Sequence, residues 1–323
     1  MGYMAGFGAS TKLESRAIGS GKWNKMKVYI RNNYLLYVFL LLPLAYFILF
    51  KYVPMYGVLI AFKDYNVFEG IEKSPWNHFA TFKEIFAMKD FHRAVINTFF
   101  LNFLDLIVGF PAPILLAVLL NELKSPKFKK ASQTILYLPH FISWVIIGSM
   151  AQQLFSSQTG MINILIENLG GKPVAFLTTE KLWVTVYVLL GMWQGMGWNS
   201  IIYLAAISGI NSELYEAAEV DGAGRLRKIW HITIPGIKST IIILLIMQMG
   251  RITAIGFDRP YVLGNSLVSG VSDVISTFTY RVGLRSFQFS EATAVGLFQS
   301  IVGMIFLLIT NYIAEKSDEQ GIW

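Results

Sequence analysis

Six long runs of apolar residues constrain this chain more than any other feature of its sequence. Most of them hold 20 to 26 residues with almost no charge, which is enough for an α-helix to cross about 30 Å of hydrocarbon at about 1.5 Å per residue. We therefore expect an all-α membrane protein with six transmembrane helices. The runs lie at 34–50, which can extend past Lys51, and at 96–120, 134–155, 182–207, 237–257 and 292–313.

Composition agrees with a membrane location and excludes several kinds of chemistry. Of 323 residues, 54% are hydrophobic and only 15% are charged, whereas soluble domains average about a quarter charged residues. The absence of cysteine excludes disulfides, thiolate metal sites and thiol nucleophiles. The net charge of +7 would suit nucleic acid, but no nucleic-acid motif accompanies it. Basic loops on the cytoplasmic side of a membrane explain it better, so we expect no nucleic-acid partner.

Basic residues near the N-terminus predict the orientation. Residues 1–33 contain six Lys and Arg against one acid, Glu14, and such clusters stay in the cytoplasm. An even number of spans then places both termini on that side. We therefore divide the chain into a cytoplasmic tail at 1–33, a six-span domain at 34–313 and a second cytoplasmic tail at 314–323.

The connections on the opposite side are long and partly amphipathic. We expect one short interfacial helix near 76–88 and a second within 156–181, where the sequence reads GMINILIENLG. Two interpretations remain open at this point: the helices form a lid on the outer face, or they are ordinary connecting loops.

Enzymatic signatures are absent from the sequence. The four histidines show no metal-ligand spacing, so we expect no metal site, and neither a phosphate-binding G-x-x-x-x-G-K-[ST] loop nor a G-x-S-x-G elbow occurs. The apolar runs also hold too few acids and histidines for an intramembrane enzyme. We therefore expect no catalytic residue, no cofactor and no ATP site of its own.

The loop at 207–236, which we call the coupling loop, is predicted to form two short helices. Ser212 is a plausible N-cap of the first helix, and small residues along it would let a partner approach closely. The Asp221–Gly222 pair should end this helix, since glycine accepts backbone conformations closed to other residues. A second helix is expected over 224–233, ending near Pro235, which lacks an amide hydrogen.

This loop resembles a known motif. Glu216-Ala217-Ala218, Asp221-Gly222-Ala223 and Ile232-Thr233-Ile234-Pro235 match the EAA loop of type I ATP-binding-cassette importer permeases. The stretches 55–76, 97–123 and 256–265 are similar to the maltose-type sugar permeases, and most similar to the subgroup that imports complex oligo- and polysaccharides. The resemblance therefore implies the type I importer permease fold and a saccharide substrate, with acidic alginate or pectin fragments among the candidates.

The resemblance also implies partners and a location. The chain would sit in the bacterial cytoplasmic (inner) membrane beside a second homologous permease subunit, two ATPase subunits that bind ATP and Mg, and an extracytoplasmic solute-binding protein. An interfacial helix held on lipid headgroups by Arg225, Arg227 and Lys228 is the competing interpretation of the loop. The residues implied to dock on an ATPase are Leu214, Glu216, Ala217, Ala218, Asp221, Gly222, Ala223 and Pro235.

Candidates for the substrate pathway come from polar residues inside the spans, which are costly in lipid. Asp105 and Arg251 lie at similar depths, so they either form an ion pair or leave Arg251 facing the pathway, where its guanidinium could bind an acidic sugar. Three glycines weaken the helix at 191–200. Its Trp193 and Trp198 could stack on sugar rings or merely pack, and the resemblance places Trp198 at a sugar site. Further candidates are Gln194, Asn199, Gln248, Thr253 and Asp258.

Two alternatives to a saccharide permease stay open. One is a permease of the same architecture for another solute. The other is a membrane channel or scaffold, which would purify without ATPase subunits.

Overall fold

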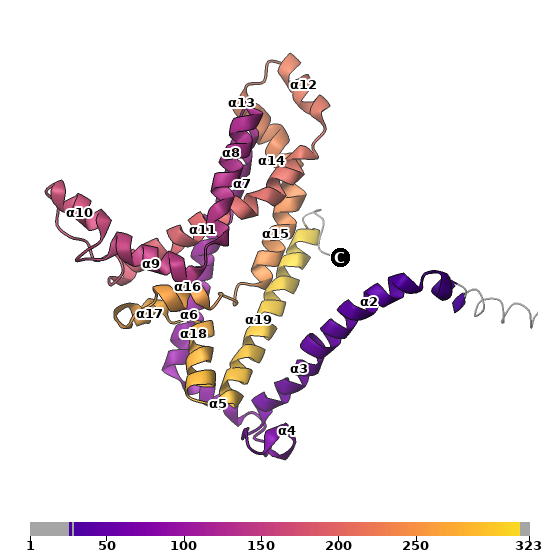
Figure 1. The fold of residues 1–323 in the computed structure, drawn as a ribbon, viewed down its shortest axis with the longest axis vertical. Coiled ribbons are helices and arrows are strands. Elements are labelled where there is room, and N and C mark those ends of the chain that lie inside the picture. Colours follow the sequence, from indigo (N-terminus) through magenta and orange to yellow (C-terminus); the bar gives the residue numbers. More distant parts are fainter. Residues whose placement is uncertain (1–25, 28, 317–323) are drawn as a thin grey trace, which may run out of the picture. The chain divides into compact units, whose positions relative to one another are not determined.

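The structure, a computed structural model, describes residues 26–27 and 29–316 (Figure 1). Backbone contacts divide the chain into two units, Met1–Leu59 and Ile60–Trp323, which are described separately. The described residues form helices joined by turns, and their only β-type pairing is a single bridge between Lys63 and Trp76. The expected all-α fold is therefore confirmed.

The first unit is dominated by one apolar helix. It comprises α2 (Tyr34–Phe47), a π-turn (Ile48–Tyr52) and α3 (Val53–Met55), and a 3-10 segment (Tyr56–Phe62) follows. The run predicted at 34–50 thus extends past Lys51, because the stretch Tyr34–Phe62 is a 29-residue candidate span. Its most apolar window has no residue buried within this chain, as expected of side chains that face lipid or another subunit. The proposed tail at 1–33 lies mostly outside the described residues.

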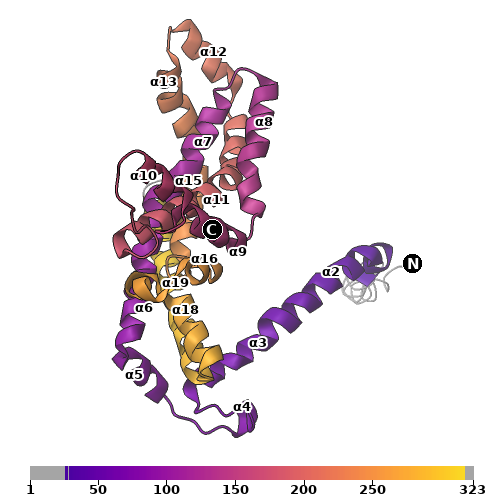
Figure 2. The same cartoon turned by 60° about the vertical axis from the view of Figure 1, so that its left-hand side comes forward.

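Three further runs correspond to long helices of the second unit. α6 (Lys89–Leu104), a π-turn (Asp105–Gly109) and α7 (Pro111–Asn121) form one span. α11 (Glu180–Ser208) packs along α7, and α19 (Phe289–Lys316) packs along α15 (Lys238–Gly250). Figure 2 shows α6 and α7 following one another through the unit. These helices agree with the runs predicted at 96–120, 182–207 and 292–313.

Two runs that were expected to be continuous helices are broken. α8 (Pro126–Tyr137) and a 3-10 turn (Leu138–Phe141) meet α9 (Trp144–Phe155) at 98°. The cause is local, because the Ser143 side chain accepts a hydrogen bond from the Ile146 amide and starts a new helix. The run at 134–155 therefore does not form one continuous helix, although the bent pair can still count as one span.

The run at 237–257 is also shorter as a helix than predicted. α15 ends at Gly250 and turns follow at 251–253. Side chains replace the lost helical bonds: the Asn102 amide donates to the Ile252 carbonyl at 2.6 Å, and the Gln299 amide donates to the Thr253 carbonyl. Irregular backbone is tolerated inside a membrane protein when neighbouring groups satisfy it in this way.

Among the described residues, three helices are long and apolar enough to be spans, or up to five if each bent pair counts as one span. The second bent pair is Arg225–Gly236 with Lys238–Gly250, at 57°. α11 has 29 residues, which is also long enough, although its glycine-rich centre makes it less apolar. With α11, the spans occur where the six runs predicted them.

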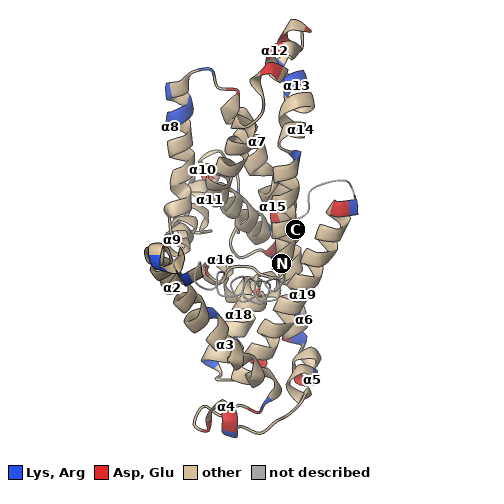
Figure 3. Cartoon of the chain, turned by 90° about the vertical axis from the view of Figure 1, so that its right-hand side faces the viewer, with Lys and Arg blue, Asp and Glu red and all other residues tan. Residues whose placement is uncertain are grey.

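Charged residues gather at the two ends of the second unit, around α8, α12 and α13 at one end and α4 and α5 at the other (Figure 3). The expected short outer helices are present as α5 (Ala80–Ala87) and α10 (Met161–Asn168). Whether they form a lid stays a prediction. The remaining short elements are α4 (Gly70–Lys73), α16 (Asp258–Leu263), a 3-10 turn (Ser266–Val268), α17 (Ser269–Ser272), α18 (Ile275–Thr279) and a π-turn (Tyr280–Arg285).

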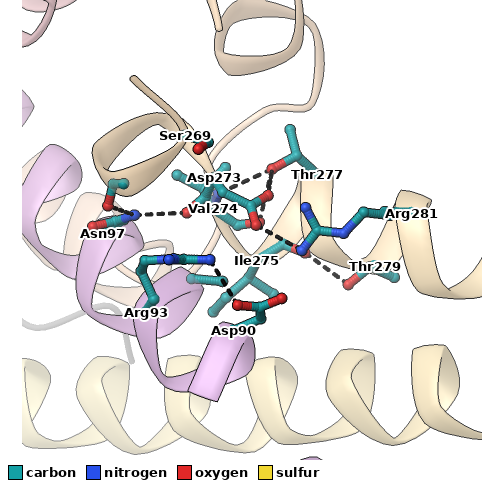
Figure 4. Close-up of polar contacts among 12 residues, drawn as sticks. Asp90, Arg93, Asn97, Ser269, Asp273, Val274, Ile275, Thr277, Thr279 and Arg281 are labelled. Carbon is teal, nitrogen blue, oxygen red and sulfur yellow. Dashed lines mark hydrogen bonds and ion pairs between the residues drawn. The ribbon is translucent and has the colours of Figure 1, made fainter. Parts of the chain in front are cut away.

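The segment between α15 and α18 is fastened to one face of α6 (Figure 4). The buried Asn97 amide donates to the carbonyls of Gly270 and Asp273, both at 2.9 Å. Asp273 accepts hydrogen bonds from Thr277 at 2.8 Å and Arg281 at 2.7 Å. A segment without a long helix of its own is thereby held in a fixed position beside α6.

Candidate functional site

The coupling loop folds into the two short helices that the sequence predicted, with one correction at its start. α12 (Ser212–Val220) begins one residue after Asn211, whose side chain accepts a hydrogen bond from the Glu213 amide at 3.0 Å. Asn211, not Ser212, is therefore the N-cap. Asn211 has the extended backbone that a cap requires, whereas Ser212 already lies in the first helical turn.

Gly222 ends α12 as expected. Its φ is +74°, a left-handed conformation that side chains with a Cβ rarely adopt. The Ala223 amide donates back to the Ala218 carbonyl at 2.8 Å, and the Gly222 amide donates to the Glu219 carbonyl at 3.1 Å. These bonds satisfy helix-end carbonyls and fix the angle at which the chain leaves α12.

The second arm of the coupling loop runs from α13 (Arg225–Lys228) through a π-turn (Ile229–Thr233) to α14 (Ile234–Gly236). It ends one residue beyond Pro235, close to the expected point. Two contacts join it to α12: the hydroxyls of Tyr215 and Thr233 lie 3.0 Å apart, and Lys228 lies 3.5 Å from Glu219. The arms therefore form one braced unit.

α12 projects at one end of the second unit (Figure 1), and both arms of the coupling loop carry exposed apolar side chains. Val220 is 89% exposed, and Leu214, Leu226 and Trp230 are exposed as well. The remaining predicted docking residues are exposed, except Ala218 and Ala223, which are half-buried. Such a surface on a braced element suits a docking site for another protein.

A second candidate site lies between the helices. Two adjoining cavities, of about 320 and 370 Å³, share a wall formed by Asp105, Gly191, Gly195, Asn199 and Arg259. Gln248 and Arg251 line the first cavity, and Gln194 and Asp258 line the second. Five of the eight main pathway candidates thus line one or both cavities, and so does the further candidate Asp258. The five are Asp105, Gln194, Asn199, Gln248 and Arg251.

Three predicted residues lie elsewhere. Trp193 lines a separate apolar pocket between α9 and α11. The Trp198 ring stacks on His140, with centroids 4.7 Å apart and planes 4° apart. Thr253 is buried and donates to the Gln299 carbonyl at 3.1 Å. Neither tryptophan lines the two cavities, so their contact with sugar stays a prediction.

The ion pair in the cavity wall differs from the one that the sequence left open. Asp105 does not pair with Arg251; it accepts two hydrogen bonds from Arg259, at 2.8 and 3.1 Å. Sequence reasoning missed Arg259 because it follows the apolar run at 237–257. The sequence did show a basic residue close to the end of an apolar run, which could have marked Arg259 as a candidate. That residue lies near α6 only because the chain turns at 251–253.

Among the described residues, no three histidine, aspartate or glutamate side chains are grouped so that they could hold a metal ion.

The family is shown by comparison with known proteins. Residues 85–318 match the sequence model described as "Binding-protein-dependent transport system inner membrane component". The chain belongs to this family, and with the fold and coupling loop described above it is a permease subunit of the type I ATP-binding-cassette importer class. The resemblance seen in the coupling loop is thereby confirmed.

Two relatives and one solved structure show how similar this chain is to individual members of the class. The chain is 43% identical to Protein LplB of Bacillus subtilis (strain 168), over 97% of this chain and 98% of that one. It is 45% identical to the polygalacturonan/rhamnogalacturonan transport system permease protein YteP of the same organism, over 91% of each chain. A solved chain from a bacterial ABC transporter involved in the import of the acidic polysaccharide alginate is 39% identical. It matches with a TM-score of 0.83, over 90% of this chain and 99% of that one.

Proposed function

We propose that this permease imports an acidic oligo- or polysaccharide, such as alginate or pectin fragments, into the cytoplasm by alternating access. Polygalacturonan, rhamnogalacturonan and alginate, named for two of the relatives, all contain uronic acids. Arabinooligosaccharides, named for a Bacillus subtilis relative that is only 32% identical, do not. The more similar relatives therefore favour a sugar that carries carboxylates.

Arg251 is the observation within the chain that carries the proposal. It lines the first cavity with Gln248 and Asn199, its side chain is exposed, and among the described residues no carboxylate lies within ion-pair distance of it. A guanidinium presents several N–H donors in a plane that matches a carboxylate. Arg251 would therefore bind a uronate directly, with the neighbouring amides binding hydroxyls.

The complete importer would contain a second homologous permease subunit, two ATPase subunits and an extracytoplasmic solute-binding protein. A related solved transporter was crystallised with an alginate pentasaccharide-bound periplasmic protein, which supports the last of these. The ATPases would bind ATP and Mg, because the sequence of this chain contains no phosphate-binding G-x-x-x-x-G-K-[ST] loop. Both termini would lie in the cytoplasm, as the basic residues in 1–33 predict.

The coupling loop would dock on one ATPase. Leu214, Glu216, Ala217 and Ala218 would form the contact on α12, and Asp221-Gly222-Ala223 with Pro235 would set the angle between the two arms. Closure of the ATPases on ATP would move this braced element. The helices that line the cavities would follow and open the pathway outward, and hydrolysis would reset it.

The test compares acidic with neutral substrates in the full transporter reconstituted in vesicles with its binding protein. Arg251→Gln should reduce uptake of an acidic oligosaccharide more than uptake of a neutral one of the same length. Arg31→Gln removes an equal charge just before α2, in the first unit and outside the cavity-forming second unit, and should change neither uptake. Equal losses for both sugars in Arg251→Gln would contradict the proposed role of Arg251.

A further inference from the structure

The shared wall of the two cavities contains a site built around one guanidinium. The carbon centre of the Arg259 guanidinium lies 3.6 Å from the centroid of the Tyr187 ring, and its Nη2 donates to the Tyr187 carbonyl at 2.6 Å. A Cβ at Gly191 would overlap the guanidinium. Stacking, a carbonyl acceptor and a missing side chain thus hold Arg259 in one position, which a lysine could not occupy in the same way.

Asp105 occupies the carboxylate-binding side of this guanidinium. Its two oxygens accept from Nη1 and Nη2 of Arg259, in the paired geometry that arginine forms with any carboxylate. The Nε of Arg259 is buried and without a hydrogen-bond partner among the described residues. A uronic acid that reached this wall would therefore find an arginine of suitable shape whose Nη1–Nη2 edge is already occupied by a carboxylate.

The pair is accessible from the cavities. The side chains of Arg259 and Asp105 are 13% and 21% exposed, and both residues line both cavities. Asp105 begins the π-turn within the α6–α7 span, and such wide turns often occur at functional positions. The pair is therefore placed where a solute moving between the cavities would pass.

We propose that Asp105 is a specificity-determining residue that masks Arg259 from acidic substrate. This inference rests on the proposed function. The Asp105 carboxylate competes with substrate carboxylates for the same guanidinium, so an acidic saccharide passes the wall without being retained. A transport pathway needs such weak sites, because a solute that binds too tightly leaves too slowly. Arg251, exposed in the first cavity, attracts the solute, and the masked Arg259 lets it leave.

The test measures binding of tetragalacturonate, with maltotetraose as the neutral comparison, to the purified complete transporter in lipid nanodiscs by calorimetry. Asp105→Asn removes the competitor and should tighten binding of tetragalacturonate at least about tenfold, which is ~1.4 kcal/mol. It should leave maltotetraose unchanged and slow the release of the acidic sugar. Asp105→Asn combined with Arg259→Gln should lose the gain.

Three outcomes would overturn the masking role: unchanged tetragalacturonate affinity in a folded Asp105→Asn transporter, a gain that persists in the double variant, or an equal gain for maltotetraose. If Asp105→Asn fails to assemble, Gly191→Ala serves as the second variant. Its Cβ displaces the guanidinium from Asp105 while both charges remain, and it should also tighten tetragalacturonate binding. Unchanged binding in that variant would overturn the proposal as well.

The same measurements separate this inference from the proposed function. If wild-type transporter imports tetragalacturonate but Asp105→Asn shows no gain, the masking role fails and the substrate class stands. If the wild type imports no acidic sugar but Asp105→Asn binds tetragalacturonate through Arg259, the masking holds and the substrate class fails.

Discussion

The hydroxyls of Tyr215 and Thr233 lie 3.0 Å apart and connect the two arms of the coupling loop. Thr233 is buried and Tyr215 is half-buried, so this contact is shielded from most of the surrounding water. Together with the Lys228–Glu219 contact, it braces two arms that are joined through the turn at 221–224. A coupler that transmits motion between subunits must not bend at its turn, and this bond opposes such bending.

Tyr215→Phe should therefore weaken coupling without preventing assembly. Loss of one such hydrogen bond costs about 1 kcal/mol, and the freed arms should lower substrate-stimulated ATP hydrolysis severalfold in the reconstituted transporter. Tyr312→Phe, at an exposed tyrosine near the end of α19, is the matched control and should behave as wild type. Full stimulation in Tyr215→Phe would show that the bond is dispensable for coupling.

Gly222→Val should abolish substrate-stimulated ATP hydrolysis while membrane insertion persists. The φ of +74° at Gly222 costs about 1–2 kcal/mol for a residue with a Cβ, and more for a β-branched one. The backbone should then relax and change the angle after α12. Stimulation and membrane content are measured together.

Gly224→Val is the control for this backbone effect. A Cβ at either glycine would meet no atom of this chain within 4 Å, but Gly224 has an ordinary φ of −69°. Gly224→Val should therefore retain much more stimulation than Gly222→Val. Equal damage from both changes would implicate side-chain bulk at the docking surface and refute the conformational explanation.

Asn97→Asp should destabilise the permease more than Asn97→Ala. Asn97 is 7% exposed, and its amide donates to two carbonyls. A carboxylate there would face two acceptors as a buried unpaired charge, at a cost of about 3–5 kcal/mol, whereas alanine loses about 1–3 kcal/mol. The melting temperatures of the two variants in detergent show which is less stable. Asn168→Asp, at an exposed position, is the control and should leave the melting temperature unchanged. A lower melting temperature for Asn97→Ala than for Asn97→Asp would contradict the hydrogen bonds drawn in Figure 4.

Deletion of residues 2–20 should leave uptake intact. These residues lie outside the described part of the chain and outside the family match at 85–318. The deletion retains Lys22, Lys25, Lys27 and Arg31, which suffice for the cytoplasmic orientation under the positive-inside rule. Uptake is measured per inserted transporter, so lost transport at normal insertion would assign these residues a role in the transport core.

Much of the fold was predictable because lipid leaves few options to the backbone. An apolar run long enough to span must be helical there, so the runs at 96–120, 182–207 and 292–313 predicted helices in the structure. The two-helix form of the coupling loop was also predictable. It depends on Gly222 and on the small residues of α12, whose backbone preferences act over a few neighbouring residues and do not depend on the rest of the chain.

Other features depended on residues far apart in sequence. Asn102 satisfies the Ile252 carbonyl and so permits the turn that shortens the run at 237–257. That turn brings Arg259 to Asp105 and leaves Arg251 exposed in the cavity. Hydrophobic periodicity cannot foresee such pairings, because it records the average environment of a helix face and not which individual donors and acceptors meet.

The sequence by itself therefore determined the membrane class, the positions of the spans and the coupling loop, since these follow from run length, charge and local turn chemistry. The tertiary structure decided where two of those runs break, which arginine pairs with Asp105, and which tryptophans stay outside the cavities. The physical reason is that a buried polar group must find its partner wherever the packed helices place one, and that placement is a property of the whole fold.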